Sequence, residues 1–277
     1  MALTAGRSDI TVGLVDGPIA MNHPDLAGDI REVPGRLGGR CTQSSSAACQ
    51  HGTFVAGILC AKRGSAAPAI CPDCTLLAYP IFAETASGTQ TPTATPEDLT
   101  AAILACIEAG ARILNLSLAL TQSSSKAERA LEQALDHAAR RGVLIVAAAG
   151  NQGTIGSTII TAHPWVIPVV ACDLRGKPVN ESNLGNSIGR RGLRAPGDQI
   201  TSLGAEREPL MLGGTSAAAP FVTGAIALAW SEFPAATAAQ LRLAFTHAHA
   251  AERSTVTPPL LDAWAAYQHV LTTHSRR

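Results

Sequence analysis

The 277-residue sequence predicts an α/β protein with a mostly parallel central sheet flanked by helices. Short apolar runs recur along the chain, and they are too continuously apolar for strands with one face in water. Segments with helical spacing lie between these runs. Strands that alternate with helices imply right-handed crossovers and helices on both faces of the sheet. The active site of such a sheet is expected at the carboxyl ends of its strands.

Four apolar runs predict the strands. The first covers residues 10–15 and ends at Asp16, where Gly17-Pro18 must begin a turn. The others cover residues 76–82, 112–118 and 143–149. Asp16 and Asn151 therefore stand at the carboxyl ends of two predicted strands.

Capping residues predict the helices between the strands. Thr95 is expected to cap a helix with Pro96 at its first position. Ser125 and Glu128 form a capping-box pattern ahead of a second helix, which Gly142 ends.

Two further helices are expected beside His51 and Ser216. Residues 54–60 are apolar, so His51 is predicted to project from the start of a helix. Ser216 begins an Ala-rich helix running to Trp230, with Pro220 in its first turn.

A single domain is expected over residues 1–277, with a core over about 9–250 and a C-terminal tail over about 270–277. Stretches rich in Gly, Ser and Thr are interpreted as loops within it: 35–48, 85–95 and 152–162.

Charge and hydropathy exclude several partners. Lys plus Arg and Asp plus Glu both number 21, so no net field attracts nucleic acid or an anionic membrane. No stretch reaches the roughly 18 apolar residues of a spanning helix, and residues 1–10 lack a signal-peptide core. We expect a soluble protein of the cytoplasm.

The seven cysteines leave alternatives open. Three lie in apolar runs and are expected to be inert core residues: Cys60, Cys106 and Cys172. Cys71 and Cys74 could form a redox pair, or a zinc site together with Cys41 and Cys49. A disulfide such as Cys41–Cys49, or free thiols, is favoured because the spacing of Cys41 and Cys49 is wide for a zinc knuckle.

Three short motifs supply the groups of a serine nucleophile. They are Val-Asp-Gly-Pro around Asp16, His-Gly-Thr-Phe-Val-Ala-Gly from His51, and Gly-Thr-Ser-Ala-Ala-Ala-Pro around Ser216. A serine needs an imidazole to take its proton, and the imidazole needs a carboxylate to fix its tautomer. A Gly-x-Ser-x-Gly match at residues 185–189 lacks the strand and helix of a nucleophile elbow, so it is interpreted as a loop.

These motifs resemble those of the subtilisin family, and they follow its order of acid, histidine and serine. The resemblance implies that Asp16 orients His51, that His51 acts as base and then acid, and that Ser216 attacks the peptide. The segment Ala-Ala-Ala-Gly-Asn ending at Asn151 matches the family's oxyanion motif. Asn151 and the backbone N–H of Ser216 would then form the oxyanion hole.

Within the family the chain looks most like the cyanobactin maturation proteases, which cleave the precursor peptides of ribosomally made natural products. The resemblance rests on Asp-Gly-Pro-Ile at 16–19, His23-Pro24, Cys74, Pro-Ile-Phe at 80–82 and the segment 144–151. Relatives that are secreted carry a folding pro-segment, so this chain is expected either to fold unaided or to be a domain of a longer protein.

The resemblance also implies how substrate binds. Family members add an extended peptide as a strand, here along Ser117, Leu118, Ala119, Ala148, Ala149 and Gly150. The family usually has two glycines where this chain has Ala119 and Leu120, which predicts a narrowed cleft.

No metal and no other cofactor is expected. Many subtilisins hold calcium near the position of Asp25, but the loop 61–64 carries Lys62 and Arg63 where oxygen ligands are needed. Two rival functions stay open: a general degradative intracellular subtilisin, and a catalytically silent scaffold that binds peptides.

Overall fold

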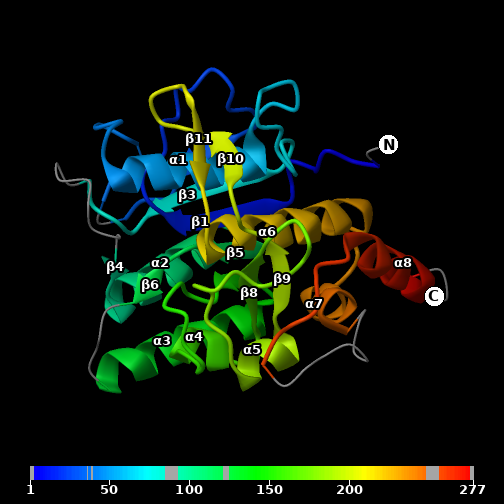
Figure 1. Cartoon of the computed structure of the whole chain (residues 1–277). Helices are drawn as coiled ribbons and strands as arrows, with labels where there is room; N and C mark the ends of the chain where they lie inside the picture. Colours follow the sequence, from blue (N-terminus) through cyan, green and yellow to red (C-terminus); the bar gives the residue numbers. More distant parts are fainter. Residues whose placement is uncertain are drawn as a thin grey trace.

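One seven-stranded sheet forms the centre of the computed structural model, which describes residues 3–35, 37–38, 40–84, 93–120, 125–247 and 256–274 (Figure 1). The strand order is β2-β3-β1-β5-β7-β8-β9, and all neighbouring strands in this sheet are parallel. Its strands are β1 (Thr11–Asp16), β2 (Ile30–Glu32), β3 (Thr75–Pro80), β5 (Ile113–Leu116), β7 (Leu144–Ala148), β8 (Val166–Cys172) and β9 (Leu193–Pro196). The predicted α/β class is confirmed.

Two small sheets lie beside the main one. They pair β10 (Ile200–Leu203) with β11 (Pro209–Leu212), and β4 (Thr93–Ala94) with β6 (Ala119–Leu120). The helices are α1 (Ala47–Cys60), α2 (Pro96–Glu108), α3 (Ser125–Arg141), α4 (Ile159–Ala162), α5 (Asn186–Arg191), α6 (Thr215–Glu232), α7 (Ala238–His247) and α8 (Ala263–His274). No helix among the described residues is both long enough and apolar enough to cross a membrane.

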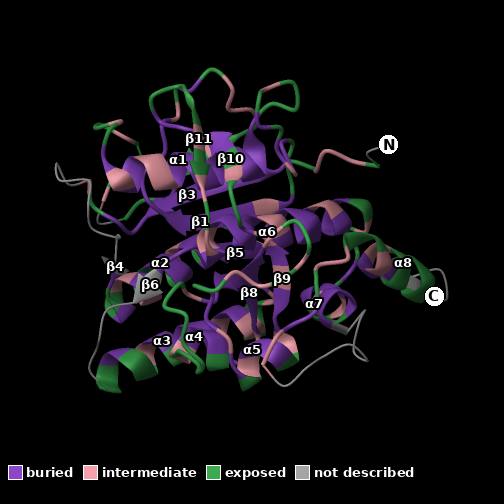
Figure 2. Cartoon of the chain, in the orientation of Figure 1, coloured by how far each residue is buried: buried purple, intermediate pink, exposed green. Residues whose placement is uncertain are grey.

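Both faces of the main sheet are buried. Val12 and Leu14 of β1 pack in the cluster that includes α1 and α6, whereas Val15 packs in the cluster that includes α2 and α3. Successive side chains of a strand point to opposite faces, so one apolar strand serves both clusters. Figure 2 shows the buried residues concentrated in this central layer.

The helix caps agree with the sequence in part. The Thr95 hydroxyl accepts a hydrogen bond from the Asp98 N–H at 3.1 Å ahead of α2, as predicted. Ser125 is the first described residue of α3, and residues 121–124 lie outside the described residues, so the capping box with Glu128 stays a prediction. The helix gives way at Gly142, where φ is +67°.

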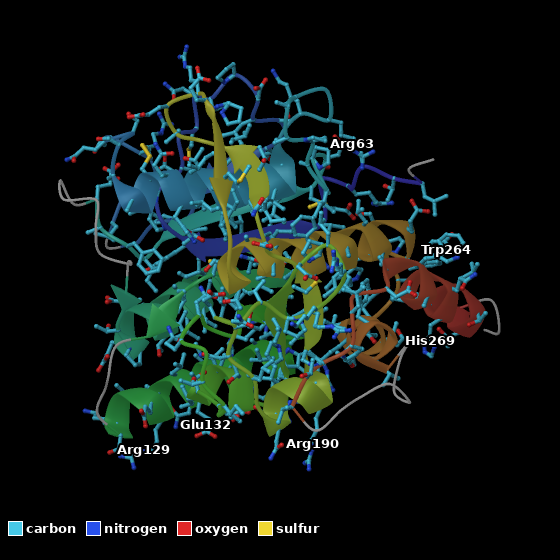
Figure 3. The ribbon with its side chains drawn as sticks, viewed as in Figure 1. Arg63, Arg129, Glu132, Arg190, Trp264 and His269 are labelled. Atoms are coloured by element: carbon cyan, nitrogen blue, oxygen red, sulfur yellow. A yellow bond between two sulfur atoms is a disulfide. The ribbon has the colours of Figure 1, made fainter. Side chains whose placement is uncertain are left out.

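α3 turns its charged side to the outside. Its buried residues follow helical spacing: Ala127, Leu131, Ala134, Leu135 and Ala138. Arg129 and Glu132 project away from the sheet, as does Arg190 of α5 (Figure 3).

Two helices begin elsewhere than expected. α1 begins at Ala47, where the Ser46 hydroxyl accepts from Cys49 N–H, so His51 is the fifth residue of the helix and not at its start. α6 begins at Thr215, which makes Pro220 its sixth residue and places it beyond the first turn.

Three segments interpreted as loops contain short elements. α4 lies within 152–162, and β4 lies within 85–95. The Gly-x-Ser-x-Gly match overlaps α5, where Ser187 shares a hydrogen bond of 2.6 Å with Ser157. It is a helix and not a loop, but it carries no nucleophile elbow.

The C-terminal region is part of the core. Residue 270 was expected to begin a tail, yet Val270 lies in α8 and is 1% exposed. The Arg194 N–H donates to the Pro259 carbonyl at 2.7 Å, which attaches the segment before α8 to β9. The core therefore extends beyond residue 250, and Figure 1 shows α7 and α8 side by side at one end of the molecule.

Candidate active site

Asp16 ends β1 and is completely buried. Its Oδ1 accepts two hydrogen bonds of 2.6 Å, from Nδ1 of His51 and from the N–H of Gly17. Gly17 is required because a Cβ at this position would lie 1.9 Å from the Ala48 carbonyl oxygen of α1. The close approach of α1 to the turn brings His51 onto the carboxylate.

The contact with Asp16 sets the tautomer and basicity of His51. Nδ1 donates its proton to the carboxylate, so Nε2 of the neutral ring carries the lone pair that can take a proton. Burial acts to lower the pKa of His51, but the charge of Asp16 and its hydrogen bond outweigh this and raise the pKa above its ordinary value. Nε2, the basic atom of the ring, therefore lies on the side away from Asp16.

A disulfide fastens the start of α1. Cys41 and Cys49 form a disulfide, with their Cα atoms 5.4 Å apart. Cys49 lies two residues before His51. The sequence favours a disulfide or free thiols over a metal site without settling a pairing, and the structure contains the Cys41–Cys49 bond. The zinc alternative is wrong, because the disulfide consumes both thiols. Gln50 adds two hydrogen bonds, to the Ser44 carbonyl at 2.8 Å and from the Ala205 N–H at 3.0 Å.

The three cysteines expected in the core are buried there. Cys60 lies in α1, Cys106 in α2 and Cys172 at the end of β8. Burial raises the pKa of both Cys60 and Cys106 to about 12, so these thiols stay protonated and unreactive near neutral pH.

Ser216 is the second residue of α6 and shares one cavity with His51. Gly214 precedes the helix with φ of +98°, a left-handed conformation that glycine adopts without strain. The cavity measures about 180 Å³ and is lined by His51, Phe82, Ser117, Leu118, Ala148, Gly150, Asn151, Gln152, Thr215 and Ser216. The structure thus brings the predicted base, nucleophile and oxyanion residue into one place.

Asn151 is oriented by Thr215. Its Oδ1 accepts from the Thr215 N–H at 2.9 Å and from the Thr215 hydroxyl at 3.0 Å. Because the amide oxygen is occupied in this way, the Nδ2 amino group is the end of the side chain left for a developing oxyanion. The positive end of the α6 dipole acts in the same direction.

Asn183 holds the loop that carries Asn151. Its Oδ1 accepts from the backbone N–H groups of Gln152 and Thr154 at 3.0 and 3.1 Å. Its Nδ2 donates to the Ala149 carbonyl at 3.2 Å. The sequence offers no signal for this role, because Asn183 is separated from the loop by β8.

Four of the six residues predicted to bind substrate line the cavity: Ser117, Leu118, Ala148 and Gly150. Ala149 instead lines a separate cavity, and its N–H donates to the Val169 carbonyl at 2.9 Å. Ala119 belongs to β6 and pairs in parallel with Thr93 of β4. Sequence reasoning missed Phe82, Gln152 and Thr215 as lining residues.

The segment around Asp25 does not suit calcium. Lys62 Nζ donates to the Pro24 carbonyl oxygen at 2.6 Å, and the Lys62 N–H donates to the Asp25 carbonyl at 2.7 Å. The ammonium group of Lys62 thus binds a carbonyl oxygen of the kind that a calcium ion would need as a ligand.

Comparisons with known proteins agree with this geometry. The model of the subtilase family matches residues 7–262. Subtilisin DY of Bacillus licheniformis is 31% identical over 242 residues, which cover 85% of this chain and 81% of that protein. Subtilisin E of Bacillus subtilis strain 168 is also 31% identical, but the match covers 59% of its length.

Solved structures extend the likeness over the whole chain. A mutant of the protease domain of PatA has a TM-score of 0.87 at 28% identity and covers 99% of both chains. The prenylagaramide maturation protease PagA has a TM-score of 0.83 at 28% identity, over 96% of this chain and 95% of its own. The PatG macrocyclase domain, at 20% identity and a TM-score of 0.82, shows the fold alone. The chain belongs to the subtilase family and is a subtilisin-like serine protease.

Proposed function

We propose that Asp16, His51 and Ser216 form the catalytic triad of this protease and that Asn151 completes its oxyanion hole. The 2.6 Å bond between Asp16 and His51, at the cavity that His51 shares with Ser216 and Asn151, is the observation that carries the assignment. Ser216 Oγ attacks the scissile carbonyl carbon and its proton passes to Nε2 of His51. Asn151 Nδ2 and the Ser216 N–H stabilise the negative oxygen that results.

The second half of the reaction follows from the same groups. The tetrahedral intermediate collapses, the C–N bond breaks, and the leaving amine takes the proton from His51. Water then attacks the carbonyl carbon of the acyl-enzyme and gives a proton to His51. The ester bond to Ser216 Oγ breaks, Ser216 takes the proton back from His51, and the carboxylic acid product is released. The Asp16 carboxylate stabilises the imidazolium in both steps.

The substrate of the proposal is an unfolded precursor peptide of a ribosomally made natural product. PatA and PagA are described as maturation proteases for patellamide and prenylagaramide, and the likeness to them covers nearly the whole chain. The small cavity supports an extended peptide lying along Ser117-Leu118 and Ala148. The pairing of β6 with β4 supports a cleft that is narrowed next to β6, the strand that follows Ser117-Leu118.

A cytoplasmic location is part of this proposal, because ribosomal precursor peptides arise there. Cell fractionation combined with thiol trapping checks it. The protein should be recovered with cytoplasmic markers. Recovery outside the cell with Cys41–Cys49 oxidised would contradict this location, since stable disulfides are typical of oxidising compartments.

Cleavage specificity tests the substrate class. Purified protein and its Ser216→Ala variant are incubated with a library of short peptides and, separately, with unfolded casein, and the cut sites are mapped by mass spectrometry. The proposal predicts few cut sites that share a sequence and are absent with Ser216→Ala. Cuts throughout casein would support the general degradative subtilisin, and no cuts in either substrate would favour the silent scaffold.

A further inference from the structure

A chain of buried hydrogen bonds runs from the centre of the sheet to the helix that carries Ser216. The Thr223 hydroxyl donates to Asn115 Oδ1 at 2.8 Å, and Asn115 Nδ2 donates to Ser117 Oγ at 2.8 Å. Ser117 Oγ then donates to the Ser216 carbonyl oxygen at 3.2 Å. Asn115 and Thr223 are fully buried, and Ser117 is 2% exposed.

The carbonyl of Ser216 needs this donor because of Pro220. In a regular helix the N–H four residues ahead would bond to it, but proline has no N–H. Ser117 supplies the missing donor from outside the helix. The residue that lines the cavity beside His51 is therefore also the residue that restrains the backbone of Ser216.

The direction of every bond in the chain is fixed. The amide oxygen of Asn115 is occupied by Thr223, so its amino group must face Ser117. Ser117 Oγ accepts from that amino group, and its own proton is directed to the Ser216 carbonyl. Thr223 therefore sets the orientation of the Asn115 amide and, through it, of the Ser117 hydroxyl.

The chain begins and ends on the same helix. Thr223 lies seven residues after Ser216, about two turns along one face of α6. Asn115 lies in β5 and Ser117 directly follows the end of this strand, where the hydrogen bond between their side chains joins them. The sheet thus holds α6 at two points, one of them at the residue assigned as the nucleophile.

We infer that Asn115 and Thr223 are positioning residues that set the place of Ser216 relative to His51 through Ser117. This inference rests on the assignment of Ser216 as the nucleophile. Its physical basis is that catalysis by an oriented nucleophile is sensitive to small displacements, whereas folding tolerates them. A purely structural chain would affect stability without affecting reaction at Ser216.

Substitution of Thr223 tests the inference. Thr223→Val keeps the shape of the side chain and removes the donor, whereas Thr223→Ser keeps the hydroxyl. The readout is the rate at which a fluorophosphonate probe labels Ser216, which requires no knowledge of the substrate. We expect Thr223→Val to lower this rate by about tenfold and Thr223→Ser to restore it to within about twofold of the original.

Ser231→Ala is the matched control. Ser231 is buried on the same helix, and its hydroxyl donates to the Ala227 carbonyl at 2.8 Å, far along α6 from Ser216. This variant should lose thermal stability and keep the labelling rate. If Thr223→Val does not fold, Thr223→Ala also removes the hydroxyl, together with the Cγ2 methyl group, and is compared with Thr223→Ser in the same way.

Failure of the positioning role and failure of the proposed function would give different results. Unchanged labelling of a destabilised Thr223→Val protein, or an equal fall in Ser231→Ala, would overturn the positioning role and leave the triad intact. Absence of any probe adduct on Ser216 in the unsubstituted protein would contradict the proposed function itself.

Discussion

The pH dependence of activity should follow from the contact between Asp16 and His51. Only the neutral imidazole accepts a proton, so activity rises as pH increases through the pKa of His51. Asp16 raises that pKa, which places the rise above the ordinary pKa of histidine. Asp16→Asn should move the rise to lower pH and cut the turnover by about 10⁴-fold.

Rates of peptide hydrolysis measured from about pH 5 to about pH 9 check this prediction, because these values span the range in which histidine titrates. Asp9→Asn is the control, because Asp9 is an exposed acid that pairs with Arg7. It should leave the profile in place. A profile of Asp16→Asn that coincides with that of the original protein would contradict the role of Asp16.

Asn151 should contribute to turnover more than to binding. Its Nδ2 meets the substrate oxygen only as negative charge develops, so Asn151→Ala should lower kcat by about 10²- to 10³-fold, the range for loss of this donor in subtilisin. KM should change by no more than about threefold. Steady-state kinetics of Asn151→Ala beside Asn186→Ala, an exposed residue of α5, separates the effect from general damage. A loss seen in KM alone would argue against an oxyanion role.

Local motifs revealed the reacting side chains but not their supports. Asp16, His51, Asn151 and Ser216 could be predicted because each stands in a short motif. Thr215 and Asn183 could not, because their partners depend on how the loop 150–154 folds against α6 and β8. Hydrogen bonds between distant residues leave no periodic pattern in a sequence.

The disulfide ahead of His51 should stabilise the start of α1. It closes a loop between residues eight positions apart, which corresponds to about 2–3 kcal/mol of unfolding free energy. The double variant Cys41→Ser/Cys49→Ser should lose this amount in urea denaturation. Reductant should shift the midpoint of the original protein and have no effect on the double variant. An unshifted midpoint in the original protein would show that the bond does not contribute.

The start of α1 illustrates the limits of prediction for single elements. The segment 41–46 is rich in Ser and Thr, which are typical of turns, so the sequence predicts a loop here and a helix that starts too late. The Ser46 cap and the disulfide allow the helix to begin at Ala47. By contrast, the cap at Thr95 was predicted correctly because Pro96 marks it unambiguously.

The C-terminal helix α8 packs against the core of the molecule through one side only. Val270 is 1% exposed, whereas the adjacent Leu271 is 42% exposed. Val270→Ala should lower the free energy of unfolding by about 2 kcal/mol, and Leu271→Ala by less than about 0.5 kcal/mol. Thermal and urea denaturation of both variants measures the difference. Equal values would show that α8 does not pack against the core as described.

The architecture as a whole could be predicted only where burial imposes a pattern. Strands buried on both faces produce continuous apolar runs, which predict four strands of the main sheet, β1, β3, β5 and β7. The strands β2, β8 and β9 are not among those predicted. The place of α8 was not predicted either, because it depends on contacts such as Arg194 with Pro259, which join segments distant in the chain. The parallel pair of β4 and β6 was missed for the same reason.

Labelling with a fluorophosphonate probe, mapped by peptide mass spectrometry, tests most directly whether these contacts make a catalyst. The geometry predicts a single adduct, on Ser216, that is absent from the Ser216→Ala variant and slowed at low pH as His51 becomes protonated. A folded protein that takes up no probe, or that is labelled equally in Ser216→Ala, would contradict the assignment of Ser216 as the nucleophile.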